Sequence, residues 1–180
     1  GHYRSMRRHD AAPALCDREG DSRRTGQALL NVFALFHLNL AFSSIEEEQR
    51  PEVVRKCFVP LLELAERRGP IAIEATGYTL EAIKACDPGW QVRLAALAKT
   101  GKVEFIGSGY SQMIGPLVPA GMVAANLRLG HEAYQRLLGL TPRIALVNEQ
   151  AWSAGLVGPY LDAGYDALLL DWDNVAVFHH

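Results

Sequence analysis

The sequence has little cysteine and no long apolar run, and both shortages exclude classes of protein. Its longest apolar stretches, such as residues 29–36 and 167–170, fall far short of the roughly 20 residues that a membrane-spanning helix needs. The three cysteines (Cys16, Cys57 and Cys86) form no Cys-x-x-Cys pair and no Cys/His cluster, which argues against a disulfide framework or a zinc site. No apolar core of a secretory signal occurs in residues 1–30. We therefore expect a cytoplasmic protein without a membrane partner.

The chain also has no excess of charge of one sign. Its 18 Lys and Arg residues and 20 Asp and Glu residues give a net charge of −2, and the basic residues gather on no single segment. Nucleic-acid binding needs a basic surface, so we expect no nucleic-acid partner. Residues 1–28 mix both charges without periodicity, which predicts a flexible polar N-terminal segment. The hydrophobic share of 49% in 180 residues suits a globular domain.

From residue 29 onward, apolar runs rich in β-branched residues alternate with segments of helical period. This alternation is typical of βαβ units on a parallel sheet, so it predicts an α/β fold with parallel strands. The first run is continuous enough for a strand that is buried on both faces. Five strands are predicted, at Leu29–Asn39, Ile71–Ala75, Val103–Ile106, Arg143–Val147 and Ala167–Leu170.

The segments between these strands carry helix signals. A helix should begin near Pro51, and Pro60 inside it predicts a kink because proline lacks the N–H donor and its ring clashes with the preceding turn. Gly69 and Pro70 should end that helix. Further caps and stops are predicted at Ser44 with Glu47, Thr79, Asp87 with Pro88, Gly139 and Gly164.

Polar side chains follow every predicted strand, at the end where ligand sites form in parallel α/β folds. The sequence therefore predicts a convergent polar pocket. In chain order these residues are His37, Asn39, Glu74, Ser108, Tyr110, Gln112, Asn148, Glu149, Gln150, Asp171 and Asp173. GxSxG, P-loop, HExxH and complete GxGxxG motifs do not occur in the sequence.

Glu149 and His37 stand out, and each has two interpretations. Glu149 directly follows an apolar run and precedes Trp152; such a carboxylate can act as nucleophile or base, and an aromatic ring can stack on a sugar face. Alternatively, Glu149 caps the next helix or pairs with an arginine. His37 is either a site residue or a core histidine whose two nitrogens are both hydrogen-bonded.

Each of the remaining acidic candidates also has two interpretations. Glu74 is either a site residue or a carboxylate at the start of the following helix. Glu104 points either into a barrel interior or outward to solvent, because strand side chains alternate between faces. Asp171 and Asp173 either belong to the site or form caps and turns.

Three stretches, in this order, resemble the first three sequence regions of glycoside hydrolase family 57: Phe36–Leu40, Gly101–Glu104 and Leu146–Trp152. The resemblance covers residues 30 to about 174. It implies an incomplete, TIM-like (β/α)7 barrel that acts on α-glucans as an amylase, glucanotransferase or branching enzyme, with retention at the anomeric carbon. One departure is His37-Leu38-Asn39, where many members have His-Gln-Pro.

The resemblance also implies roles. Glu149 matches the nucleophile, and His37 and Glu104 match residues that line the substrate subsite. Retention requires a second carboxyl group about 5 to 5.5 Å from the nucleophile; in the family this acid/base aspartate lies in a fourth region, and Asp171 and Asp173 come too early for it. We therefore expect residues 29–180 to be the N-terminal part of a longer catalytic domain, truncated at its C-terminus, and inactive alone.

The full set of substrate-binding candidates is His37, Asn39, Glu74, Glu104, Tyr110, Gln112, Trp152, Asp171 and Asp173. The expected partner is a polysaccharide or oligosaccharide, and the mechanism needs no metal or other cofactor. One alternative is a non-catalytic carbohydrate-binding or degenerate barrel domain that keeps sugar-facing aromatics. Another is a polysaccharide deacetylase, whose Asp-Asp strand end and His-x3-His helix do not occur in this sequence.

Overall fold

The computed structural model describes residues 32–41 and 44–176. The fold consists of the unit that begins at Phe33. The predicted flexible segment, residues 1–28, lies outside the described residues. None of the described helices is long and apolar enough to cross a membrane.

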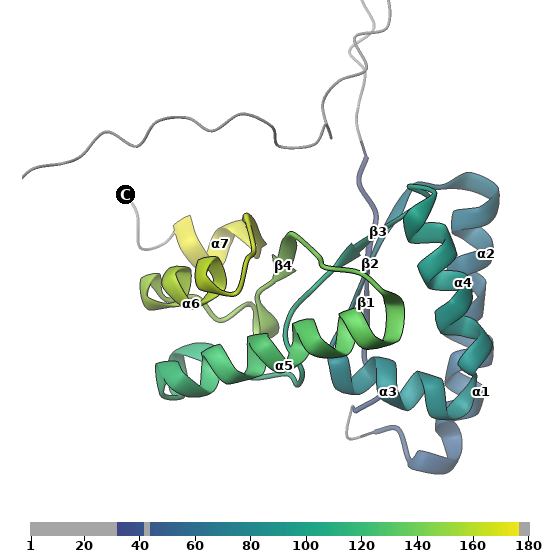
Figure 1. Cartoon of the computed structure of the whole chain (residues 1–180), viewed down its shortest axis with the longest axis horizontal. Coiled ribbons are helices and arrows are strands. Elements are labelled where there is room, and N and C mark those ends of the chain that lie inside the picture. Colours follow the sequence, from purple (N-terminus) through teal and green to yellow (C-terminus); the bar gives the residue numbers. More distant parts are fainter. Residues whose placement is uncertain (1–31, 42–43, 177–180) are drawn as a thin grey trace, which may run out of the picture. The chain divides into compact units, whose positions relative to one another are not determined.

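Parallel strands form two short sheets that meet at one residue (Figure 1). The first sheet has the order β1 (Leu35–Leu38), β2 (Ile71–Ala75), β3 (Val103–Ile106), and the second pairs β4 (Ile144–Leu146) with β5 (Ala167–Leu169). A single parallel bridge between Gly107 and Ala145 connects them. The predicted parallel α/β arrangement is therefore confirmed.

The first strand differs from its prediction. β1 covers only Leu35–Leu38 within the predicted run of residues 29–39, and the part before residue 32 lies outside the described residues. The expectation that this strand is buried on both faces is wrong. Among the described strands, β1 pairs only with β2, so it is an edge strand, and the Leu35 side chain stays 37% exposed.

A π turn interrupts the first long helical segment shortly before Pro60, where the sequence predicts a kink. This segment runs through η1 (Glu47–Gln49), α1 (Arg50–Val53), the π turn η2 (Val54–Phe58) and α2 (Val59–Arg68). The wider π turn lies directly before Pro60, where it accommodates a residue that has no N–H to donate. Gly69 and Pro70 separate α2 from β2, as predicted.

Three predicted helix caps have different outcomes. Asp87 caps α4 (Pro88–Lys99), because its Oδ1 accepts from the amides of Gly89 at 3.0 Å and Trp90 at 3.2 Å. The Thr79 prediction is wrong: Thr76 caps α3 (Gly77–Cys86), and its hydroxyl oxygen accepts from the Thr79 amide at 3.1 Å. The predicted pair of Ser44 and Glu47 is also wrong, since Glu46 and Gln49 form the capping box of η1.

The second half of the chain confirms both glycine stops. α5 (Ala120–Leu138) ends at Gly139 with φ 66°, and α6 (Val157–Asp162) is followed by Gly164 with φ 95°. A side chain would strain these left-handed conformations. The remaining elements are η3 (Gly115–Leu117), η4 (Asn148–Gln150), η5 (Ala154–Leu156) and α7 (Trp172–Ala176).

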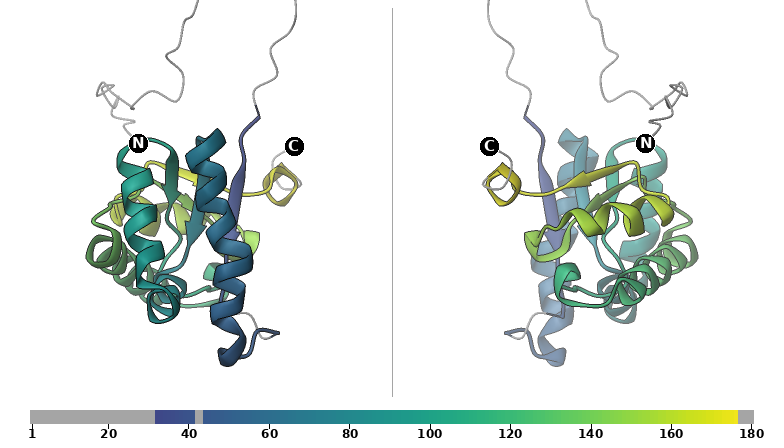
Figure 2. Two further views of the ribbon diagram at one scale, coloured as in Figure 1. Left: turned by 90° about the vertical axis from the view of Figure 1, so that its right-hand side faces the viewer. Right: turned by 90° about the vertical axis from the view of Figure 1, so that its left-hand side faces the viewer.

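The two faces of the first sheet have different surroundings. Phe36, Ile73 and Phe105 lie in register on one face and join the main hydrophobic cluster with the helices, of which α2 and α4 lie together on one side of the sheet in Figures 1 and 2. His37 and Glu74 lie in register on the other face because strand side chains alternate. The sheet therefore packs one face against the helices and carries His37 and Glu74 on the other.

Candidate functional site

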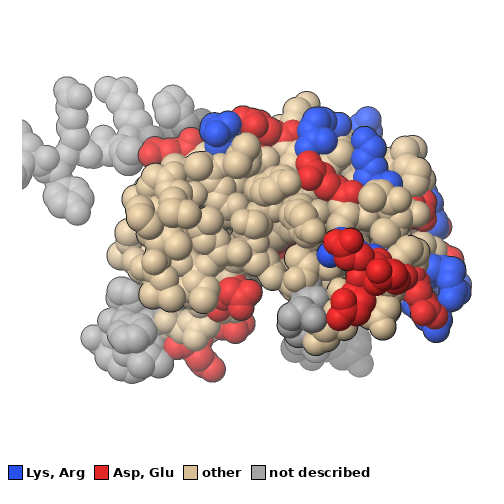
Figure 3. Space-filling model, turned by 90° about the horizontal axis from the view of Figure 1, so that it is seen from below, with Lys and Arg blue, Asp and Glu red and all other residues tan. Residues whose placement is uncertain are grey.

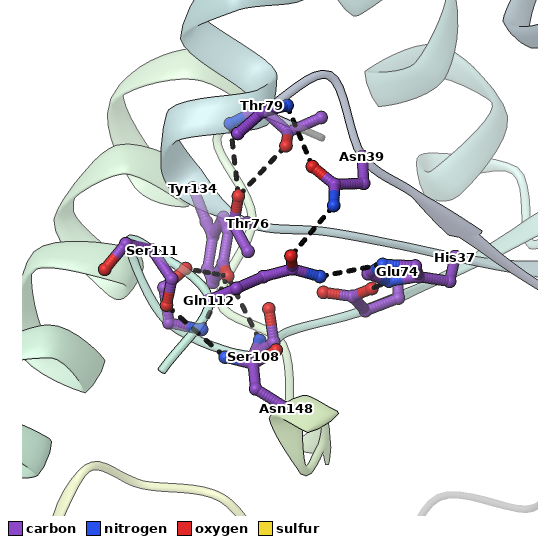
Figure 4. A network of polar contacts seen from close by, with 12 residues as sticks. His37, Asn39, Glu74, Thr76, Thr79, Ser108, Ser111, Gln112, Tyr134 and Asn148 are labelled. Atoms are coloured by element: carbon purple, nitrogen blue, oxygen red, sulfur yellow. Dashed lines mark hydrogen bonds and ion pairs between the residues drawn. The ribbon is translucent and has the colours of Figure 1, made fainter. Parts of the chain in front are cut away.

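The candidate site lies at the carboxyl ends of the strands, which is the lower end of the sheet in Figure 1. His37 on β1 is directly opposite Glu74 on β2. Asn39 follows β1, and Gln112 belongs to the loop that follows β3. The structure brings these four predicted residues into one hydrogen-bonded network (Figure 4).

Glu74 and His37 form the centre of this network. The Glu74 side chain is completely buried, whereas the His37 side chain is 39% exposed, and Glu74 Oε2 bonds to His37 Nδ1. This hydrogen bond raises the pKa of His37 above its ordinary value, against the lowering effect of burial; the charges of Glu74 and Glu149 raise it further. Thr76 caps the following helix, so the alternative that Glu74 serves as that cap is wrong.

Two amide side chains extend the network from His37 toward the chain that leaves β1. Gln112 Nε2 lies 2.9 Å from His37 Nε2, and Asn39 Nδ2 donates to Gln112 Oε1 at 2.8 Å. The backbone N–H of Ala41 donates to Asn39 Oδ1 at 2.8 Å. Both nitrogens of His37 therefore have partners, yet its ring stays open to solvent, unlike that of a core histidine.

Helix α5 holds the loop that carries Gln112. The Tyr134 hydroxyl accepts from the amides of Ser108 and Gly109, each at 3.1 Å, and donates to the Gly109 carbonyl at 2.8 Å. Asn126 accepts from the Ser111 amide at 2.9 Å and donates to the Ser111 carbonyl at 3.0 Å. Burial raises the pKa of Tyr134 to about 12, so its hydroxyl keeps its proton at neutral pH.

Asn126 and Tyr134 are positioning residues that the sequence analysis missed. Both are buried polar residues on a helix face that also carries Val123 and Leu127. A buried polar side chain needs a hydrogen-bond partner, so an asparagine and a tyrosine on an otherwise apolar helical stripe were a usable signal. Their partner, the loop after β3, could not be read from α5 alone.

Glu149 occupies a strained turn at the end of β4. Its backbone has φ 55° and ψ 13°, and Gln150 follows with φ 53°, so two successive non-glycine residues are left-handed. Such residues cost roughly 1 to 3 kcal/mol each and cluster at functional sites, where surrounding structure enforces them. The segment after β5 supplies that constraint: the Asp171 amide donates to Gln150 Oε1 at 2.8 Å, and Asn174 Nδ2 donates to the Gln150 carbonyl at 3.1 Å.

The Glu149 side chain is exposed, and it reaches the environment of His37 electrostatically. Within residues 32–41 and 44–176, it forms neither an ion pair nor a helix cap, in contrast to the two alternatives that the sequence left open. A free carboxylate at this position is available to a bound molecule.

Two predicted site residues lie apart from the network. Glu104 is exposed and shares the face of Glu74, but it pairs in register with Ala72, two residues before Glu74. Tyr110 donates from its hydroxyl to Glu81 Oε2 on α3 at 2.8 Å, and Glu81 also pairs with Arg136 on α5. The Tyr110 side chain therefore links its loop to α3, and this placement does not support its prediction as a sugar-facing ring.

The end of β5 adds further exposed acids. The side chains of Asp171 and Asp173 are exposed, and Trp152 is half-buried after η4. Asp171 takes part in the turn through its backbone, since its carbonyl accepts from the Asn174 amide at 3.2 Å. Figure 3 views the molecule from below and shows acidic atoms at its lower left and lower right, and more of them along its upper edge.

Metal-ligating side chains are scattered. In the described part of the chain, no group of three or more His, Cys, Asp or Glu residues could hold a metal ion. His179 and His180 lie outside that part.

Comparison with known proteins gives a consistent result. The sequence model of glycosyl hydrolase family 57 matches residues 24–179. Alpha-amylase 1 of Dictyoglomus thermophilum is 24% identical over 102 residues, which are 57% of this chain and 15% of that relative.

Solved structures share the fold. The 4-alpha-glucanotransferase from Thermococcus litoralis matches with a TM-score of 0.68 and 21% identity, over 77% of this chain and 22% of its own. The α-amylase AmyC from Thermotoga maritima matches with a TM-score of 0.64 and 13% identity, over 77% of this chain and 39% of its own. The chain thus spans well under half of each of these proteins. The predicted fold, part of a (β/α)7 barrel in which parallel strands alternate with helices, is confirmed.

Proposed function

Because this chain belongs to glycosyl hydrolase family 57, we propose that it contributes the nucleophile of a retaining enzyme that hydrolyses or transfers α-glucans. The observation that carries this proposal is Glu149: an exposed carboxylate, without an ion pair among the described residues, on a strained turn at the carboxyl end of β4, where its charge acts on His37. The similar proteins include an alpha-amylase and a 4-alpha-glucanotransferase, which supports α-glucans as the substrate class.

The proposed chemistry has two steps. The Glu149 carboxylate attacks the anomeric carbon, the glycosidic C–O bond breaks, and the leaving oxygen takes a proton from a second carboxyl group. Water or an acceptor sugar then attacks the anomeric carbon from the face that the leaving group occupied, the bond to Glu149 breaks, and the second carboxyl group takes the proton of the attacking oxygen. In this proposal the second group is an aspartate outside residues 1–180.

The other residues bind and orient. His37 is exposed enough to meet a sugar hydroxyl, while Glu74, Asn39 and Gln112 fix its ring. Trp152 offers a ring three residues after Glu149, and Asp171 and Asp173 offer exposed hydrogen-bond acceptors at the end of β5. The expected ligand is therefore an oligosaccharide or polysaccharide.

The test uses the natural protein that contains this chain. Glu149→Gln should lower kcat on maltooligosaccharides by at least about a thousandfold, because a carboxamide is a poor nucleophile. In Glu149→Ala, added azide should restore turnover by taking the place of the carboxylate. Glu132→Gln is the control: Glu132 is an exposed acid on α5 that pairs with Arg128, and its loss should leave kcat unchanged.

Two results would count against the proposal. Unchanged turnover in Glu149→Gln would remove Glu149 from the reaction. Calorimetric binding of maltooligosaccharides without turnover by the unaltered protein would favour the non-catalytic carbohydrate-binding alternative instead.

A further inference from the structure

The hydrogen bonds around His37 form a line with a fixed direction (Figure 4). It runs from the Ala41 N–H to Asn39 Oδ1, from Asn39 Nδ2 to Gln112 Oε1, and from Gln112 Nε2 to His37 Nε2, with lengths of 2.8, 2.8 and 2.9 Å. Side-chain amides can be turned over so that N and O exchange places. A backbone N–H cannot, so it sets the direction of the whole line.

The direction follows step by step from the first bond. Ala41 can only donate, so the oxygen of Asn39 must face it and the NH2 group of Asn39 must face Gln112. Gln112 must then present its oxygen to Asn39, which leaves its NH2 group for His37. His37 Nε2 must therefore accept, which means that it carries no proton.

The opposite side of the ring gives the complementary result. Glu74 Oε2 bonds to His37 Nδ1, and an ionised carboxylate only accepts hydrogen bonds, so Nδ1 must carry the proton. We infer that Asn39 and Gln112 are positioning residues that, together with Glu74, hold His37 as the neutral tautomer with its proton on Nδ1 and a bare Nε2.

This arrangement disfavours protonation of His37 at Nε2, whereas two nearby carboxylates favour a charged ring. Glu74 and Glu149 are the charged groups that act on the ring. A second proton on Nε2 would face the NH2 group of Gln112, so Gln112 would have to turn over, then Asn39, until two donors met at the Ala41 N–H. Asn39 thus acts on His37 without touching it.

The tautomer sets what the ring can recognise. A bare Nε2 accepts a hydrogen bond from a hydroxyl group, whereas a charged imidazolium can only donate. A ligand hydroxyl that replaces the Gln112 NH2 group would find the same acceptor. This consequence rests on the proposed function, but the state of the ring in the free protein does not.

The first test observes the unaltered chain and uses one variant only to assign signals. In the 180-residue chain labelled with 15N-histidine, two-bond proton–nitrogen correlation spectra distinguish protonated from bare ring nitrogens. His37→Gln identifies the His37 signals. Above its titration midpoint, His37 should show a protonated Nδ1 and a bare Nε2. The opposite pattern would overturn the inference, whether or not any variant folds.

The second test measures how Asn39 affects His37 through Gln112. Asn39→Ala frees Gln112 to turn its oxygen toward Nε2, so proton binding by His37 should tighten by up to about tenfold, a midpoint shift of about one pH unit. Gln112→Met keeps the side-chain length but removes both polar atoms; in this background, Asn39→Ala should change nothing further.

The outcomes distinguish an effect through the orientation of the Gln112 amide from an unspecific structural effect of the substitution. No midpoint shift in Asn39→Ala, or the same shift in both backgrounds, would show that Asn39 does not act through Gln112. His131 provides an internal reference, because it lies on α5 outside this network and its midpoint should stay constant. None of these spectra requires a sugar, so absence of glucan turnover would refute the proposed function alone.

Discussion

Replacing Glu74 by glutamine should change how the stability of the protein depends on pH. The hydrogen bond to Glu74 raises the pKa of His37 in the folded state. A raised folded pKa contributes stability that is fully present below the unfolded value of about 6.5 and is lost as the pH rises through the folded value. Glu74→Gln removes the negative charge, so it should remove this contribution on the acidic side only.

The magnitude follows from the geometry. A hydrogen bond to a charged group contributes about 1.5 to 3 kcal/mol, and solvent screening reduces this because the His37 side chain is 39% exposed. We therefore expect Glu74→Gln to lower the free energy of unfolding by about 1 kcal/mol at pH about 5.5. At pH about 9 the variant should be at least as stable as the original, because an incompletely paired buried carboxylate is costly.

Urea unfolding of the 180-residue chain, followed by circular dichroism at both pH values, measures the difference. Glu104→Gln is the matched control: it removes the same charge from the same face of the sheet, but Glu104 is exposed and lies two register positions from His37. The control should show no pH-dependent change. An equal effect of Glu74→Gln at both pH values would refute the role of His37 protonation.

Gly107→Ala should destabilise the junction of the two sheets by about 1 to 3 kcal/mol, because a Cβ there would clash with the Tyr165 hydroxyl oxygen. Tyr165→Phe alone should leave the stability unchanged or raise it. In the double variant it should recover part of the stability that Gly107→Ala loses. If the changes in urea midpoint of the two single variants simply add in the double variant, this explanation is contradicted. His131 behaves in the opposite sense to His37: burial lowers its pKa, so the unfolded chain binds the proton first and stability falls as the pH drops below about 6.5. His131→Phe should reduce that acid sensitivity, and an unchanged slope of unfolding free energy against pH would contradict the assignment.

Local sequence signals predicted most of the elements but not their limits. Apolar runs located all five strands, and Asp87 with Pro88 and the glycines after α5 and α6 marked helix ends correctly. A cap or a glycine stop acts on backbone groups within a few residues of itself, so the sequence shows it directly. The extent of β1 depends instead on its pairing with β2, which is distant in sequence.

The site was predictable to the extent that it depends on strand ends. His37, Asn39, Glu74 and Gln112 converge because parallel strands end at the same edge. Tyr110 follows β3 just as Gln112 does, yet it turns to Glu81. Which way a loop residue turns depends on the helices packed against the loop, and a single sequence does not specify that packing locally.

Among the described residues, one bridge connects the two sheets, and it lies at Gly107. The alignment of the candidate site depends on this connection. His37 and Glu74 belong to one sheet and Glu149 follows the other, and Gly107 joins them through two backbone hydrogen bonds of 2.9 and 2.8 Å. A displacement of about 1 Å between reacting groups can reduce a rate about a hundredfold. Gly107 and its two backbone hydrogen bonds therefore help to set the distance from Glu149 to His37 and Glu74, and the proposed reaction depends on that distance.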